Sequence, residues 1–173
     1  MKTSTATYLA ILAGATLWCL TIVLSPLLLS AGGGWTDVGK ILHSAFHSIC
    51  HQLADRSLHI DGEPLAVCIR CSAIYFGFLV GTILYVPASS LRISLVDNRA
   101  ILLASVVPMV VDVILDSIGI HASTPVTRLV TGSVFGLVVP FDIIPTAQSA
   151  VQELLAASRS ITPSDTRKGP LHA

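Results

Sequence analysis

Four long apolar segments dominate this sequence and leave few folds open to it. They cover residues 8–29, 65–86, 100–120 and 126–144. The hydrocarbon core of a bilayer is about 30 Å thick, and a helix of about 20 apolar residues crosses it with its backbone N–H and C=O groups paired internally. Apolar residues make up 53% of the chain and charged residues 12%, far from the composition of soluble proteins. We therefore expect an all-α fold, a four-helix transmembrane bundle in a lipid bilayer.

The polar stretches add a surface helix and a tail to this bundle. Residues 37–54, between the first two spans, predict a short interfacial helix. Residues 1–146 then form one membrane domain, and residues 147–173 form a cytoplasmic tail that is partly disordered because its end is polar. After Pro145, the segment up to Ser158 is compatible with a further interfacial helix. A cleaved signal peptide is the alternative for the first segment, but the apolar stretch exceeds the roughly 7 to 15 residues of a signal core.

Basic residues outside the spans predict the orientation of the bundle. They gather in the N-terminal flank, in the turn between spans two and three, and in the tail: Lys2, Arg92, Arg99, Arg159, Arg167 and Lys168. Lys and Arg in short loops collect on the cytoplasmic side, and an even number of spans puts these three regions on one face. We therefore expect both termini to be cytoplasmic and the loop between spans one and two to face outward. A net charge of zero gives no positive field to attract nucleic acid, which we exclude as a partner.

Three of the four cysteines lie in or next to that outward loop, close in sequence to several histidines. Cys68 and Cys71 form a C-x-x-C at the start of the second span, where unpaired amides and the helix dipole favour a thiolate. On the predicted surface helix, His47 lies three residues before Cys50 and four before His51, so two of these side chains can point at one place. Adjacent Cys50 and His51 point about 100° apart and do not readily share one ion.

A tetrahedral metal site is therefore expected at the outer surface. Its predicted ligands are Cys50, His47, Cys68 and Cys71, with His51 replacing one of the first two as the alternative. With thiolate and imidazole ligands, zinc is the default ion, and iron, copper or another transition metal stays open.

The same residues have plainer interpretations. The histidines, His43 included, can simply mark the polar face of an interfacial helix. The outer cysteines can form a structural disulfide, because disulfides persist outside the cytoplasm. Cys19, in the middle of the first span, is expected only to pack as a small apolar side chain. The sequence does not separate a metal site from a disulfide.

Charged residues inside the predicted spans form a second group on the outer side. Asp112 and Asp116 lie one helical turn apart in the third span, and Arg70 and Arg128 begin the second and fourth spans. A charge within a bilayer is costly, so we expect the arginines to pair with the carboxylates. This intramembrane charge network is either a structural ion-pair cluster or a proton or ion relay beneath the cysteines.

Two G-x-x-x-G patterns predict which helices approach each other closely. Gly77 and Gly81 lie in the second span, and Gly132 and Gly136 lie in the fourth. Small residues let two helix backbones come close together, so we expect these glycines to serve packing.

Two blocks of the sequence carry a family resemblance. The first block contains Cys50-His51-Gln52, Arg56-Ser57, Gly62, Val67-Cys68-Ile69-Arg70-Cys71, Tyr75, Gly77 and Gly81. The second contains Asp112 in the third span and the R-x-x-T-G residues Arg128, Thr131 and Gly132. Residues 42–136 thereby resemble a family of small bacterial and archaeal membrane proteins, catalogued as a domain of unknown function with a CHQ and CxRC signature. The chain departs from that pattern at Ser72-Ala73, where Thr-Gly is expected, and at Asp116, where Gln is expected.

The resemblance implies a multi-pass protein of the cytoplasmic (inner) membrane of a prokaryote, and it carries no activity. Three functions therefore compete. The first is a metal-binding membrane protein whose Cys/His cluster serves structure, sensing or metal handling. The second is a membrane thiol–disulfide oxidoreductase that uses Cys68 and Cys71, with Cys50 as resolving partner and a quinone as possible acceptor. The third is a small transporter that uses the Asp/Arg network. Whether the protein is an enzyme, and whether it forms a homo-oligomer, stays open.

Overall fold

The computed structural model describes residues 2–90, 99–120 and 122–161, and its elements are mostly helical. In chain order the elements are α1 (Lys2–Ala31), α2 (Trp35–Ala45), the 3-10 turn η1 (Ala54–Arg56), β1 (His59–Ile60), β2 (Glu63–Pro64), α3 (Ile69–Ser90), α4 (Arg99–Ser117) and α5 (Pro125–Ile161). Arg92, Arg167, Lys168 and the predicted disordered end of the tail lie outside the described residues.

Four of the helices, α1, α3, α4 and α5, are each long and apolar enough to cross a membrane. The candidate spans within them are Ser4–Ala31, Ile69–Ser89, Ala100–Ser117 and Pro125–Ser158. Large apolar side chains cover their outer surfaces; Leu17 of α1 is 65% exposed and Leu103 of α4 is 67% exposed. Such surfaces suit lipid chains better than water. The predicted all-α class is confirmed, and so are four helices that are long and apolar enough to cross a membrane.

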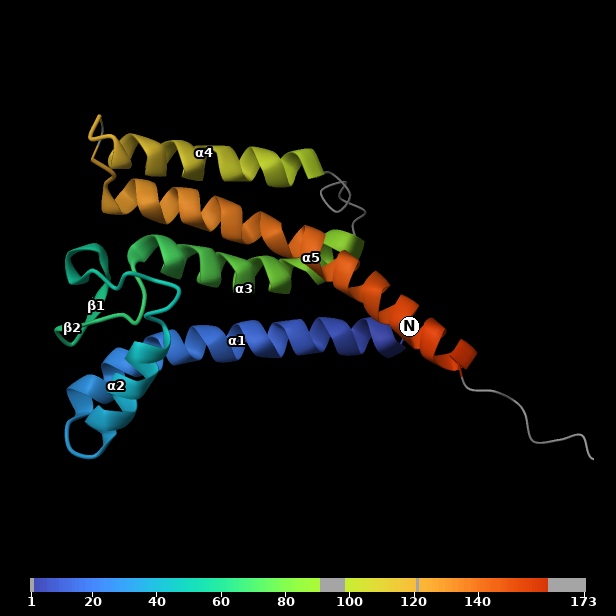
Figure 1. Cartoon of the computed structure of the whole chain (residues 1–173), viewed down its shortest axis with the longest axis horizontal. Helices are drawn as coiled ribbons and strands as arrows, with labels where there is room; N and C mark the ends of the chain where they lie inside the picture. The colour runs from blue at the N-terminus through green and yellow to red at the C-terminus, as the bar shows by residue number, and fades with distance from the viewer. Residues whose placement is uncertain (1, 91–98, 121, 162–173) are drawn as a thin grey trace, which may run out of the picture.

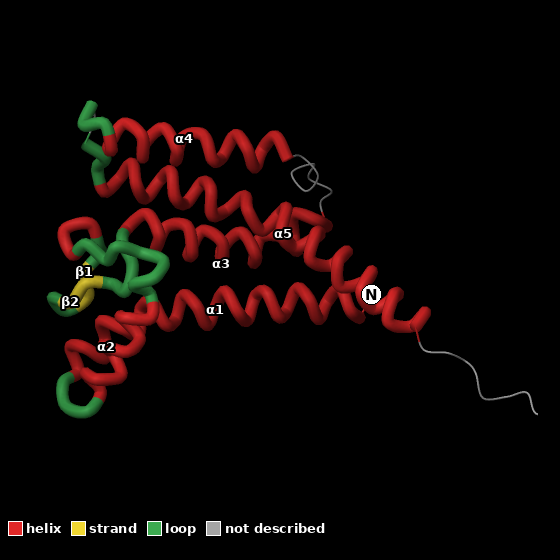
Figure 2. The backbone as a smooth tube through the Cα atoms, in the orientation of Figure 1, coloured by secondary structure: helices red, strands yellow, loops and turns green. Residues whose placement is uncertain are grey.

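The four long helices lie side by side in the order α4, α5, α3, α1 (Figure 1). α3 therefore contacts α1 on one side and α5 on the other, and α4 packs on α5. α2, the β1–β2 hairpin and the connection from α4 to α5 all lie at one end of the bundle, which we call the α2 end (Figure 2). The N-terminus and the last turns of α5 lie at the opposite end (Figure 1). Which side of the membrane each end faces stays a prediction.

Glycines bring α3 and α5 together. A methyl group added at Gly132 would lie 2.8 Å from the backbone oxygen of Arg70, and one at Gly77 would lie 3.0 Å from the backbone oxygen of Ser133. At Gly136 an added methyl group would clash with the backbone oxygen of Ile74. The packing role predicted for the two G-x-x-x-G patterns is confirmed. This close contact sets the first turns of α3 and α5 against each other at the α2 end.

The interfacial helix is shorter than the predicted segment 37–54, and the prediction is wrong beyond Ala45. The chain leaves α2 through tight turns, in which the N–H of His47 donates to the Ser44 oxygen at 3.0 Å and the N–H of Cys50 donates to the Phe46 oxygen at 3.0 Å. The backbone of Gln52 then adopts a positive φ of 51°, which a helix does not allow. The side chains of residues 47, 50 and 51 therefore do not share the helical face on which the predicted metal site depended.

A short β-hairpin with a two-residue connection lies just before α3. β1 pairs with β2 in antiparallel register, with Ile60 opposite Glu63. Asp61 and Gly62 make the connection with φ values of 51° and 85°. Positive φ at both central residues is the geometry that Asp-Gly favours in tight hairpins.

α5 continues past the point where the predicted tail begins. It is one helix from Pro125 to Ile161 and contains both Pro140 and Pro145. Pro140 is fully buried, and Gln148 donates a hydrogen bond of 3.1 Å to the backbone oxygen of Ser4 in α1. This packing holds the helix together where a proline alone would favour a break. The division into a membrane domain of residues 1–146 and a tail of residues 147–173 stays a prediction.

Candidate functional site

Three sulfur atoms meet at the α2 end of the bundle. Cys50 comes from the loop after α2, Cys68 directly precedes α3, and Cys71 lies in the first turn of α3. Their Sγ atoms all lie within 4.8 Å of one another, and we call these residues the sulfur group. Cys50 is 5% exposed, and the other two are half-buried. The backbone N–H of Cys68 donates to the Sγ atom of Cys50 at 3.2 Å, so these two segments also contact each other directly.

Cys68 occupies the N-terminal end of α3, where the helix leaves N–H groups without internal partners. Its backbone oxygen accepts the N–H of Ser72 at 2.9 Å, which begins the helix. A hydrogen bond from the Cys71 thiol is the main cause that lowers the pKa of Cys68, to about 5. Burial opposes this shift, whereas the Cys50 thiol and the backbone N–H groups of Arg70 and Cys71 support it. The sulfur group can therefore hold a thiolate at neutral pH.

Gln52 ties the two cysteine-bearing segments together. Its Nε2 atom donates to the backbone oxygen of His43 at 2.6 Å and to that of Ala66 at 2.8 Å. The Gln52 amide thereby links the last turn of α2, which precedes Cys50 in the chain, to the residues just before Cys68. The sequence marked Gln52 only as part of the family resemblance, and nothing local in it revealed this link.

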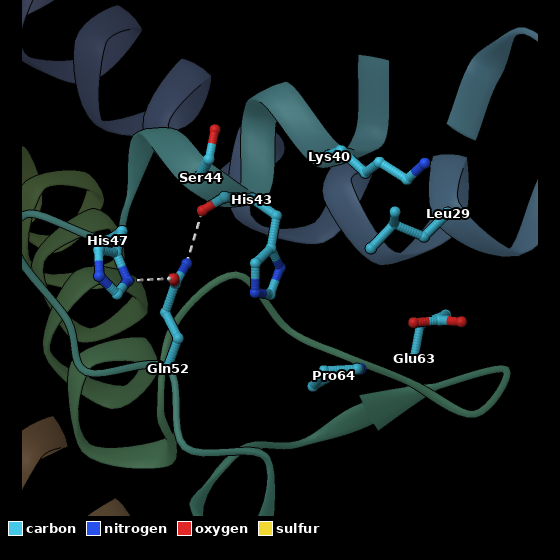
Figure 3. A pocket seen from close by; sticks show the side chains of 8 residues that line it. All are labelled: Leu29, Lys40, His43, Ser44, His47, Gln52, Glu63 and Pro64. Atoms are coloured by element: carbon cyan, nitrogen blue, oxygen red, sulfur yellow. Dashed lines mark hydrogen bonds between the residues drawn. The ribbon is translucent and has the colours of Figure 1, made fainter. Parts of the chain in front are cut away.

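The two histidines predicted as ligands lie in different places. The ring of His47 is 3.2 Å from the Oε1 atom of Gln52, on the wall of a separate pocket of about 420 Å³ that Lys40 and Glu63 also line (Figure 3). His47 is not among the described residues whose ligand atoms converge with the sulfurs. His51 lines the cavity into which the sulfur group opens. The structure thus brings His51 close to that cavity and points His47 toward Gln52.

His43 also points into the pocket of Figure 3. Burial lowers its pKa; Glu63 opposes this effect, and His47 adds to it. Its Nδ1 atom is buried and has no hydrogen-bond partner among the described residues. At neutral pH His43 is therefore mainly uncharged.

Apolar side chains pack around the sulfur group. Phe46 and Val67 are buried in the same core cluster as Cys50, and Tyr75 packs against it from α3. The ring of Trp18 in α1 meets Phe46 edge-on at 5.1 Å and Tyr75 at 5.7 Å between ring centroids. The fourth cysteine, Cys19, is buried in α1 and its thiol donates to the Tyr75 backbone oxygen at 3.5 Å. It is not a member of the sulfur group.

Two ion pairs connect α3 and α5 with α4 next to the sulfur group. The Nη2 atom of Arg70 contacts Asp112 and also donates to Ser123 at 3.1 Å. The hydroxyl of Ser123 lies 2.8 Å from one carboxylate oxygen of Asp112, and its backbone N–H donates to Asp116 at 3.0 Å. Arg128 reaches Asp116 at 3.5 Å. Asp112 and Arg128 are each 8% exposed, so these pairs are largely shielded from water.

A third arginine joins this network from the loop. The Nη1 atom of Arg56 lies 3.4 Å from the same Asp116 oxygen that Arg128 contacts. Sequence reasoning missed both Arg56 and Ser123 as members, because both lie outside the predicted spans, where a charged or polar residue needs no buried partner. The sulfur group and the three arginines, Arg56, Arg70 and Arg128, line one cavity of about 360 Å³.

Comparisons with known proteins identify the family. The model of the family described as "Predicted membrane protein (DUF2085)" matches residues 50–141, which contain the sulfur group and the ion pairs. An uncharacterised protein of Methanocaldococcus jannaschii is 35% identical over 141 residues, which cover 80% of this chain and 90% of that protein. The chain therefore belongs to this family of predicted membrane proteins. No solved structure matches it.

Proposed function

We propose that this membrane protein binds a transition metal ion through Cys50, Cys68 and Cys71, with zinc as the default ion. The observation that carries the proposal is the convergence of three Sγ atoms within 4.8 Å. Zinc–sulfur bonds of about 2.3 Å in a tetrahedral site place sulfurs about 3.8 Å apart, so small side-chain movements bring the group to bonding geometry. The lowered pKa of Cys68, about 5, supplies one deprotonated ligand before a metal arrives.

Three protein sulfurs leave a fourth coordination position. His51 lines the cavity beside the sulfur group and is the protein ligand we propose for it. His47 would have to leave Gln52 before it could take this position. A site with three fixed ligands and one adjustable position suits exchange of the ion better than a closed structural site does. We therefore favour metal sensing or handling over a purely structural role.

The orientation proposed from the basic residues puts this site on the outer face of a prokaryotic cytoplasmic membrane. In that orientation the α2 end, with the sulfur group, faces away from the cytoplasm. The ion would then be taken up from, or passed to, the outer compartment. The apolar side chains of Phe46, Val67 and Tyr75, which pack around the sulfur group, would keep the ion from passing deeper into the bundle.

Metal content of the purified protein tests this proposal. We expect about one ion per chain in the wild type, measured by mass spectrometry after gentle solubilisation. Cys68→Ser should lose that ion, because it removes the sulfur with the lowest pKa of the group. Cys19→Ser is the matched control, since it removes a buried thiol outside the group. Equal metal content in wild type and Cys68→Ser would end the proposal.

A thiol–disulfide oxidoreductase is the second candidate, and the Cys68–Cys71 contact favours it. Cys68 accepts a hydrogen bond from Cys71, as a C-x-x-C pair with one stabilised thiolate does. Oxidation would join the Cys68 thiolate to the Cys71 sulfur and release two electrons and the Cys71 proton. A quinone in the bilayer would accept these together with one proton from water and become a quinol. A pair that stayed reduced under every oxidant and quinone tested would exclude this function.

The transporter alternative receives less support from the charge network. Asp112 has Arg70 and Ser123 as partners, and Asp116 has two arginines and the backbone of Ser123. Carboxylates that are satisfied in this way suit a structural clamp between helices better than a relay, which needs a group that exchanges partners.

A further inference from the structure

The cavity beside the sulfur group is lined by more cationic side chains than its buried carboxylates can neutralise. Arg56, Arg70 and Arg128 line it, and among the described residues their buried acidic partners are Asp112 and Asp116. Asp55 approaches Arg56 at 3.9 Å, but its side chain is 76% exposed, so water screens it. The three guanidinium groups therefore share two buried carboxylates, and one oxygen of Asp116 contacts two of them.

Donors of these arginines also lack acceptors. Arg128 is 8% exposed, and the described hydrogen bond of its guanidinium is a single contact of 3.5 Å to an Asp116 oxygen that Arg56 shares. The Nε atom of Arg70 is buried and has no partner among the described residues. Each guanidinium carries five N–H donors, and a buried donor without an acceptor is unfavourable. A network that served helix packing alone would be expected to satisfy these donors.

Among the described residues, the guanidinium groups donate to Asp112, Asp116 and Ser123, and no hydrogen bond joins them to a sulfur atom of the sulfur group. The guanidinium donors thus stay available to a ligand. The cavity of about 360 Å³ has room for an ion of five heavy atoms, since a water molecule takes about 30 Å³ in the liquid.

We propose that the arginine-lined side of this cavity binds a small oxyanion of the phosphate or sulfate class, either free or as the headgroup of an anionic lipid. The planar guanidinium fork matches the spacing of two oxygens in such a group, so a bound oxyanion can accept paired hydrogen bonds. The anion would accept hydrogen bonds from the free donors of Arg70 and Arg128. The proposal goes beyond the metal site, because arginines are not metal ligands.

Calorimetric titration of the metal-free, full-length protein with inorganic phosphate tests the free-anion form. The titration is run in phosphate-free detergent at constant ionic strength, with chloride as the balancing salt. Arg56→Gln is the test variant, because the Arg56 side chain is 45% exposed and the fold does not bury it. Lys40→Gln is the matched control, since it removes the same charge at the same end from a residue that is 66% exposed and outside this cavity.

We expect saturable phosphate binding to the wild type and to Lys40→Gln, and binding weaker by about tenfold or more in Arg56→Gln, the loss of one charge-assisted hydrogen bond. If Arg56→Gln does not fold, the replacement measurement is the unfolding temperature of the wild type, which phosphate should raise more than chloride does.

Titration with dioctanoyl phosphatidic acid in the same detergent is the second experiment. Binding of this lipid without binding of free phosphate identifies a headgroup site, and the reverse identifies a free ion. No saturable binding in either arm, or equal binding by Arg56→Gln and Lys40→Gln, would overturn the proposal. A failed metal site leaves these titrations unchanged, because they use metal-free protein.

Discussion

Replacing Gln52 should weaken metal binding although Gln52 is not a ligand. Its Nε2 atom holds the backbone oxygens of His43 and Ala66 at 2.6 Å and 2.8 Å, and its Oε1 atom lies 3.2 Å from the His47 ring. A net contribution of about 1 kcal/mol per hydrogen bond makes the link worth about 2–3 kcal/mol. Without it, the loop that carries Cys50 is free to move away from Cys68. Because 1.4 kcal/mol corresponds to a factor of ten, we expect Gln52→Ala to weaken metal affinity by about 10- to 100-fold.

Titration with Co²⁺ or Cd²⁺, followed by the thiolate-to-metal charge-transfer absorption, measures this affinity. Gln52→Glu should lose at least as much, because a carboxylate cannot donate to two carbonyl oxygens. Gln148→Ala is the matched control: it removes one side-chain hydrogen bond, of 3.1 Å, at the opposite end of the bundle. Unchanged affinity in Gln52→Ala, together with an intact fold, would refute the idea that this amide positions the sulfur group.

Three further predictions concern other parts of the structure. Asp112→Asn should leave Arg70 without its counter-ion and lower the free energy of unfolding by about 3–5 kcal/mol. Its unfolding temperature should fall below that of the control Asp37→Asn, because the Asp37 side chain is 80% exposed in the wild type. Loss of an ion flux at an unchanged unfolding temperature would instead support transport. Alkylation of Cys68, measured at that residue in metal-free protein, should keep its rate as the pH falls to about 5 and then slow down. The reason is that the thiolate is protonated only as the pH passes its lowered pKa. A midpoint of the rate against pH near the ordinary value of 9.0 would contradict this. Gly136→Ala should lower the unfolding temperature, because the added methyl group would clash with the backbone of Ile74. Gly14→Ala is the control and should not lower it, because no neighbouring helix lies within 4 Å of the added methyl group. Equal stability of the two variants would argue against close α3–α5 packing.

The membrane spans were predictable because a bilayer imposes its demands on each helix separately. A segment such as 100–120 needs only its own length and apolar composition to be recognised. The glycine patterns were informative for a similar reason, since close approach of two helices requires small residues whatever the rest of the fold does. α5 was harder to predict, because the contact of Gln148 with Ser4 that supports it beyond Pro145 joins opposite ends of the chain.

The candidate site was predictable in its residue types and less so in its geometry. A C-x-x-C at the start of a span drew attention to Cys68 and Cys71, and the positions of their sulfurs follow from the helix that they begin. The approach of Cys50 depends on Gln52 and its contact with Ala66, fourteen residues away. The contact of Arg56 with Asp116 spans sixty residues, which no local pattern reveals.

His47 illustrates the same limit from the opposite direction. Its spacing to Cys50 predicted a shared helical face, but α2 ends at Ala45 and the ring faces Gln52 instead. The helix ends early because the turn hydrogen bonds and the positive φ of Gln52 redirect the chain toward α3. The structure therefore favours His51, which lines the cavity of the sulfur group, over His47 as the proposed fourth ligand.

X-ray absorption at the edge of the bound metal tests the central claim most directly. The account predicts three sulfur neighbours at about 2.3 Å for zinc and one lighter nitrogen or oxygen neighbour, with one sulfur lost in Cys50→Ser. His51→Ala should exchange the light neighbour without changing the sulfur count. A first coordination shell made only of nitrogen and oxygen, or one that is the same in Cys50→Ser as in the wild type, would contradict a metal site built on Cys50, Cys68 and Cys71.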